Sequence, residues 1–97
     1  MKIHLTAFIK VKEEFRDEVA VILQDMVYQT KKEDACELYN LHQSLEDQNL
    51  FIFHEIWKNK EGLAIHNEQP YIKAFGELIV TKLQEQPTII LTKKYKN

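Results

Sequence analysis

Hydrophobic and polar residues alternate strictly over residues 2–11, which predicts a β-strand. One face of this strand would be entirely apolar, being formed by Ile3, Leu5, Ala7, Ile9 and Val11. Over residues 12–31 the apolar residues instead recur every three or four positions, which predicts an amphipathic helix of about five turns. Acidic residues gather at the start of this helix and lysines follow its end, the order that the helix dipole favours.

Two further strands are predicted in the middle of the chain. Residues 35–45 and 50–57 are rich in apolar, aromatic and β-branched residues, and the polar residues 46–49 between them suit a tight turn. Two strands joined by so short a turn form a β-hairpin. The second arm is apolar on both faces, with Ile52 and Ile56 on one and Phe51, Phe53 and Trp57 on the other.

Two helices and a last strand are expected after the hairpin. Asn59 suits the N-cap of a short helix near residues 60–66. Pro70 fits the first turn of a helix over residues 71–83, whose apolar residues form one stripe. A second proline then blocks further helix, and the β-branched run that follows it, at 88–92, predicts a strand.

This order of elements, β-α-β-β-α-β, predicts an α+β fold of the ferredoxin-like type, with a four-stranded antiparallel sheet. Both long helices would cover one face of the sheet and leave the other uncovered. An exposed apolar face of that size is typical of an interaction site. We therefore expect two copies to pair sheet to sheet as a homodimer. The pocket would lie between the sheet and the helices or between the two sheets.

The composition fits a single soluble globular domain over residues 1–97, with 44% hydrophobic and 29% charged residues. A net charge of −2 gives no indication of a nucleic-acid or anionic-membrane surface. No apolar run reaches the roughly 18 residues of a membrane span, and the N-terminus lacks a signal-peptide core. The single cysteine excludes an internal disulfide. We expect a cytoplasmic protein without nucleic-acid or membrane partners.

The segment from residue 51 to 66 concentrates the residues that can carry chemistry. Strand alternation sends Phe53, Glu55 and Trp57 to the same face. The short helix would bring His66 back towards the end of that strand. A carboxylate on a buried strand needs a partner, and an imidazole titrates near neutral pH, so both are candidates for acid–base chemistry. The sequence contains no metal-binding histidine pair on one helix, glycine-rich phosphate loop or nucleophile elbow.

Each of these residues also has a purely structural interpretation. Trp57 would fill the core, and Tyr39 would pack there with its hydroxyl hydrogen-bonded. Glu55 would pair with a lysine, with Tyr95 or with a backbone amide. His66 would hydrogen-bond Glu55 or cap a chain end.

A family resemblance rests on three groups of residues: Cys36-Glu37-Leu38-Tyr39, Phe53-His54-Glu55-Ile56-Trp57, and His66 with Pro70-Tyr71 and Phe75. From about residue 2 to 95 the chain resembles the antibiotic biosynthesis monooxygenase (ABM) family, which folds as a dimeric α+β barrel. It is most similar to the small quinol-monooxygenase-like members. The resemblance implies a monooxygenase that acts on a quinol or a related electron-rich small aromatic molecule with O2. Such an enzyme needs no cofactor or metal, because the deprotonated substrate can itself donate an electron to O2.

The resemblance also implies roles for the residues of the predicted site. His66 would be the catalytic base, and Glu55 would orient its imidazole or bind a substrate hydroxyl. Trp57, Phe53 and Tyr39 would line the substrate pocket.

Relatives with other activities leave two alternatives. Haem-degrading members resemble this chain in Trp57 and His66, where the histidine is the axial ligand, but they carry an asparagine on the first strand at the position of Ala7. That difference argues against haem oxygenation and leaves haem binding open. The other alternative is a dimer that binds a small molecule without catalysis, or an isomerase that uses the same pocket.

Overall fold

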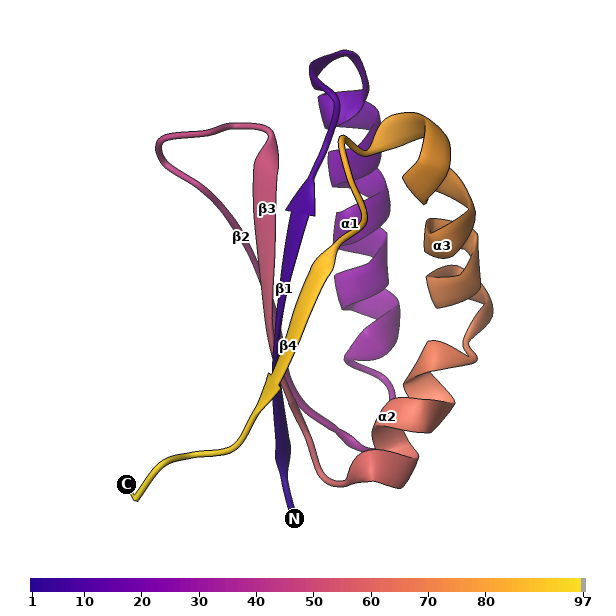
Figure 1. Ribbon diagram of the computed structural model, residues 1–97. Helices are drawn as coiled ribbons and strands as arrows, with labels where there is room; N and C mark the ends of the chain where they lie inside the picture. Colours follow the sequence, from indigo (N-terminus) through magenta and orange to yellow (C-terminus); the bar gives the residue numbers. More distant parts are fainter. Residues whose placement is uncertain (97) are drawn as a thin grey trace.

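The computed structural model describes residues 1–96 and contains the elements that the hydrophobic pattern predicts (Figure 1). Their order is β1 (Ile3–Lys10), the 3-10 helix η1 (Glu13–Phe15), α1 (Arg16–Thr30), β2 (Cys36–Gln43), β3 (Leu50–Trp57), α2 (Lys60–Asn67), α3 (Pro70–Lys82) and β4 (Thr88–Thr92). The predicted ferredoxin-like α+β fold with a four-stranded antiparallel sheet is confirmed, with α2 as an extra short helix before α3.

Most element boundaries agree with the sequence prediction to within one residue, and two larger differences have local causes. The first helix is divided, because Phe15 has backbone angles of φ −109° and ψ 5°, outside the α-helical region. The second strand ends two residues earlier than predicted. The hydroxyl of Ser44 accepts hydrogen bonds from the backbone N–H groups of Glu46 and Asp47, both at 3.1 Å, and so starts the turn.

The sheet has the strand order β2-β3-β1-β4, with every neighbouring pair antiparallel. Helices α1 and α3 lie side by side over one face of it (Figure 1). The odd-numbered residues of β1 and β3 are buried beneath these helices, where they meet core residues of α1 such as Val19 and Leu23. Because β1 and β3 are central, their covered faces form the floor on which any site between sheet and helices must be built.

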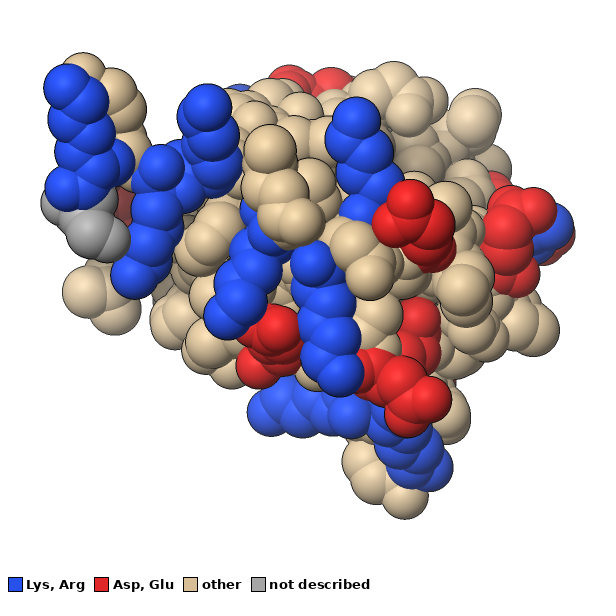
Figure 2. Space-filling model, turned by 90° about the horizontal axis from the view of Figure 1, so that it is seen from below, with Lys and Arg blue, Asp and Glu red and all other residues tan. Residues whose placement is uncertain are grey.

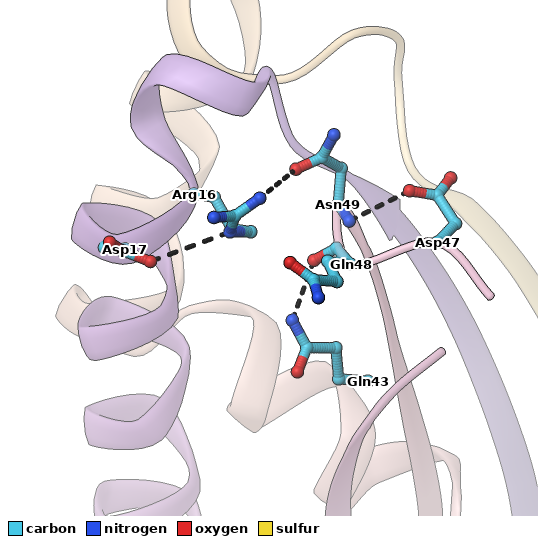
Figure 3. Close-up of polar contacts among 6 residues, drawn as sticks. All are labelled: Arg16, Asp17, Gln43, Asp47, Gln48 and Asn49. Carbon is cyan, nitrogen blue, oxygen red and sulfur yellow. Dashed lines mark hydrogen bonds and ion pairs between the residues drawn. The ribbon is translucent and has the colours of Figure 1, made fainter. Parts of the chain in front are cut away.

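The turn between β2 and β3 is fastened to the start of α1, at one end of the sheet (Figure 3). The guanidinium of Arg16 donates to the side-chain oxygen of Asn49 at 3.3 Å. The backbone N–H of Val11 donates to the Asn49 carbonyl at 2.8 Å. Asp47 accepts from the Asn49 N–H at 2.9 Å, which keeps the turn compact. These bonds attach the hairpin turn to the segment that leads from β1 into the first helix.

Charges of both signs meet at the opposite end of the molecule. Figure 2 shows basic side chains gathered over that end, with acidic side chains between them. Lys2, just before β1, and Glu37, near the start of β2, form an ion pair with their charged atoms 2.8 Å apart. Within residues 1–96, every helix is too short or too polar to cross a membrane.

Candidate functional site

A cavity of about 280 Å³ lies between the sheet and the helices, the first of the two predicted places. Most of its wall is apolar and comes from β1 and α3: Leu5, Ala7, Ile9, Ile72, Phe75 and Ile79. Five side chains with polar atoms also line it: Tyr39, Glu55, His66, Asn67 and Gln86. Ile89 of β4 lines the cavity as well and is 59% exposed, so the cavity meets solvent beside the last strand.

Glu55 is a buried carboxylate on β3 that the strand alternation points into this cavity. Its Oε1 accepts a hydrogen bond of 2.8 Å from the indole Nε1–H of Trp57, two residues along on the same face. Burial raises the pKa of Glu55 to about 7, although the Trp57 bond favours the ionised form and opposes that rise. The carboxyl therefore takes both protonation states near neutral pH.

His66 reaches the cavity from the last turn of α2. This short helix is held at its start by Asn59, whose side-chain oxygen accepts the backbone N–H of Gly62 at 2.7 Å. Gly62 in turn lies directly against Ala35, because a Cβ at residue 62 would stand 2.2 Å from the Cβ of Ala35. The absence of a side chain there lets α2 approach the start of β2. With α2 this close to the sheet, His66 is buried, and the residue as a whole is 4% exposed.

Glu33, in the loop between α1 and β2, holds the imidazole from behind. Its Oε2 lies 2.8 Å from Nδ1 of His66, and the hydroxyl of Tyr71 donates to the same oxygen. Burial lowers the pKa of His66, and the Glu33 carboxylate offsets part of that change. The hydrogen-bond network thus assigns the proton of a neutral ring to Nδ1 and leaves the Nε2 lone pair for a molecule in the cavity.

Aromatic rings surround this imidazole. The indole of Trp57 has its centroid 4.4 Å from that of His66, and Tyr39 follows at 5.5 Å. Tyr39 also packs on Phe53, with ring centroids 4.9 Å apart. Burial raises the pKa of Tyr39 far above its ordinary value, so the group is a neutral hydroxyl at physiological pH.

The structure brings together four of the five residues predicted for the site, since His66, Glu55, Tyr39 and Phe53 all line the one cavity. Trp57 is completely buried behind them and contacts Glu55 and His66 rather than the cavity. The catalytic and binding roles of all five stay predictions.

Two expectations about the polar contacts were wrong. Glu55 does not orient the imidazole, because the Nδ1 partner is Glu33. Tyr95 is not the partner of Glu55, since its side chain is 76% exposed and Trp57 supplies the hydrogen bond. Glu33 falls between the helix predicted over residues 12–31 and the strand predicted over residues 35–45. It lies 33 residues from His66, where no helical or strand spacing signals the contact.

The remaining chemistry-bearing groups are set apart from the cavity. Burial raises the pKa of the Cys36 thiol to about 11, which makes it a poor nucleophile. His54 stands on the uncovered face of the sheet against His42, with ring centroids 5.1 Å apart. Across residues 1–96, the structure forms no group of three or more His, Cys, Asp and Glu side chains that could hold a metal ion.

Known proteins similar to this chain agree with that fold. The family described as antibiotic biosynthesis monooxygenase matches residues 2–78. The Bacillus subtilis protein named "Putative monooxygenase YcnE" is 33% identical over 71 residues, which cover 73% of this chain and 75% of that protein. The "Uncharacterized protein sll1783" of Synechocystis is 30% identical over 69 residues, or 71% of this chain. The match spans about half, 47%, of the Synechocystis protein.

A solved structure extends the comparison to almost the whole chain. The crystal structure of PA3566 from Pseudomonas aeruginosa superimposes with a TM-score of 0.91, covering 97% of this chain and 94% of that one. Its sequence is 23% identical, so this likeness concerns the fold alone. The family match over residues 2–78 and the Bacillus relative confirm the resemblance seen in the sequence: this chain belongs to the antibiotic biosynthesis monooxygenase family.

Proposed function

We propose that this protein is a cofactor-independent monooxygenase that hydroxylates a quinol or a related electron-rich aromatic molecule with O2. The observation that carries the proposal is an apolar cavity whose wall presents a neutral imidazole, held from behind by a carboxylate. A general base needs this arrangement: Glu33 fixes one ring nitrogen, and the other nitrogen would accept the proton of the substrate.

The electrons for this reaction come from the substrate. Nε2 of His66 takes the proton of a substrate hydroxyl, and the resulting quinolate transfers one electron to O2. The substrate radical and superoxide then combine through a new C–O bond at a ring carbon. His66 returns its proton to that peroxide, and the O–O bond then breaks. The outer oxygen leaves as water by also taking the hydrogen of the same ring carbon, which becomes a carbonyl. In sum, one quinol and one O2 yield one hydroxyquinone and one water.

The rest of the cavity suits such a substrate. A volume of about 280 Å³ is near the lower end for small-molecule sites and fits one or two fused rings. The apolar wall of β1 and α3 would exclude water from the charged intermediates. Glu55, with its pKa near 7, would hydrogen-bond the second hydroxyl of the quinol, which completes the set of residues that we assign to the site. Phe53 and Tyr39 would contact the rings, and Trp57 would hold Glu55 in place.

Haem binding is the second candidate function, and one observation favours it. A histidine whose Nδ1 is hydrogen-bonded to a carboxylate is a common metal ligand, and His66 has this arrangement. Two observations speak against haem oxygenation. Ala7, at the position of the asparagine of haem-degrading relatives, lines the cavity with a methyl group, and Trp57 lies outside the cavity, away from any bound ring.

We also propose that two copies pair through the uncovered faces of their sheets. Ile52 and Ile56 lie half-buried on that face, opposite the helices, where no element of residues 1–96 covers them. A second sheet stacked on this face would remove their side chains from water. A dimer of this kind that binds a small molecule without oxidising it, or isomerises it, is the third candidate.

One set of measurements separates these functions. Purified protein is mixed with 1,4-naphthoquinol in air and under nitrogen, and O2 consumption is compared with the autoxidation rate. Consumption that exceeds autoxidation and is lost in His66→Gln supports the proposal. A Soret shift on adding haemin, without quinol oxidation, supports haem binding. No response in either assay favours the non-catalytic or isomerase dimer.

A further inference from the structure

We infer that Glu33 is the positioning residue for His66: it fixes the imidazole in the Nδ1–H tautomer and stabilises the imidazolium that forms when Nε2 takes a proton. The inference rests on the proposed function, in which His66 is the base, and it assigns a role to a residue outside the cavity wall. Its basis is the 2.8 Å contact between Oε2 of Glu33 and Nδ1 of His66, in a cluster that also contains Tyr71.

Glu33 can act only through His66. The carboxylate does not line the cavity that holds Glu55 and His66. It borders a separate hollow of about 210 Å³, together with Asp34 and Gly62. Its side chain is 11% exposed, compared with 5% for that of His66. A carboxylate in this position contacts the imidazole without lining the cavity in which the substrate would bind.

The backbone holds Glu33 in place independently of its side chain. Its N–H donates to the carbonyl of Thr30 at 2.9 Å, and its carbonyl accepts the N–H of Cys36 at 3.1 Å. The hydroxyl of Tyr71 donates to Oε2, so two donors converge on one oxygen. A carboxylate fixed in this way presents a lone pair to Nδ1 without having to reorganise when charge develops on the ring.

The surroundings of His66 leave Glu33 as its charge partner. The other titratable groups around the cavity end of α2 are Tyr39, Tyr71 and Glu55. Both tyrosines are neutral hydroxyls, because burial raises the pKa of each. Glu55 faces the cavity and is bonded to Trp57, so it does not compete for Nδ1. The negative charge that touches the imidazole is therefore that of Glu33.

The test reads the tautomer directly and needs no substrate. Long-range ¹H–¹⁵N NMR spectra of labelled protein distinguish Nδ1–H from Nε2–H, and His66→Gln identifies the signals of His66 among the four histidines. We expect the wild-type ring to carry its proton on Nδ1. Glu33→Gln keeps an acceptor but removes the charge, so the pKa of His66 falls below its wild-type value. Glu33→Leu removes both, so the Nδ1–H preference is lost as well.

Two controls make the result specific. Tyr71→Phe removes a contact of the same cluster and keeps the charge, so the tautomer stays and the pKa of His66 does not fall. Glu68→Gln makes the same chemical change at an exposed residue that pairs with Lys73, and should leave every His66 signal in place. The inference is overturned if wild-type His66 carries its proton on Nε2, or if the His66 titration of folded Glu33→Gln matches wild type.

Kinetics add a second readout that separates this inference from the proposed function. Glu33→Gln should lower kcat by roughly 10²-fold or more, within the range that acid–base catalysis supplies, with little change in KM. An unaltered kcat in the Glu33→Gln variant of an active enzyme overturns the positioning role while the monooxygenase proposal survives. If the wild-type protein oxidises no quinol, the monooxygenase proposal fails, and the NMR result still decides whether Glu33 sets the state of His66.

Discussion

Strand β3 contributes residues to both faces of the sheet, but the two faces differ in whether its polar side chains are buried. On the covered face, β3 contributes Glu55 and Trp57, both buried and hydrogen-bonded to each other. On the open face the same strand contributes Ile52 and Ile56, half-buried, beside the exposed His54. The covered face has enough packing to hold a carboxylate out of water, whereas the open face lacks any covering element within residues 1–96. We assign chemistry to the first face and association to the second, and the following predictions test that division.

The largest effect is expected at His66. Replacing it by Ala should lower the turnover of quinol by roughly 10²–10⁴-fold, because the base would be lost. The matched control is His54→Ala, which removes a histidine from the open face of β3. Rates are measured as O2 consumption per folded molecule, with thermal melts alongside, since His66 is buried. Equal losses in both variants would contradict the division between the faces.

An acidic residue on the open face should disrupt association rather than folding. Ile56→Asp places a charge where a second sheet would cover it, which costs several kcal/mol if unpaired, but in the single chain that side chain still reaches water. We expect ultracentrifugation at micromolar concentration to show a folded monomer in place of the wild-type dimer. Leu45→Asp, at a fully exposed turn position, is the matched control and should stay dimeric. A wild-type monomer would refute the sheet-to-sheet pairing.

Much of this division could be predicted from the sequence, because it follows from periodicity. The alternation over residues 50–57 places Phe53, Glu55 and Trp57 together, and the structure has them on one face. The capping residue Asn59 marks the start of α2. Glu33 was missed, since a loop residue carries no period and its contact with His66 depends on how closely α2 approaches Ala35. Likewise, nothing in the sequence shows that Trp57 lies behind the cavity rather than on its wall.

The buried carboxyl on the covered face should make the fold less stable at high pH. In the unfolded chain Glu55 ionises near its ordinary pKa of 4.5, while burial keeps it protonated up to about pH 7 in the folded state. Because the folded state binds more protons in that window, its stability falls as pH rises from about 4.5 to 7 and the loss persists above it. Glu55→Gln lacks this cost and still offers an oxygen to the Trp57 indole.

Denaturant titrations of both proteins measure this difference. The stability of Glu55→Gln relative to wild type should rise between pH 4.5 and 7 and reach of the order of 3 kcal/mol above it. Because Glu55→Gln and wild type are compared at the same pH, the contributions of the other titrating groups to stability cancel. Glu61→Gln, exposed in the first turn of α2, is a control that should show no such rise. A difference that stays constant with pH would mean that the Glu55 pKa is not raised.

The smallest effect is expected at Trp57, and it tests whether the indole acts through Glu55. Trp57→Phe keeps an aromatic ring in the core but removes the N–H that donates to Oε1 at 2.8 Å. That bond favours the ionised carboxylate, so its loss should raise the pKa of Glu55 further. A hydrogen bond to a charged group contributes about 1.5–3 kcal/mol, which sets an upper limit of roughly one to two pKa units on the rise.

Titration followed by ¹³C NMR of the Glu55 carboxyl measures the change in pKa, and Tyr95→Phe, at an exposed position, is the control. An unchanged or lowered Glu55 pKa would show that Trp57 serves packing alone, and the covered face would then hold its carboxyl by burial without help from the indole.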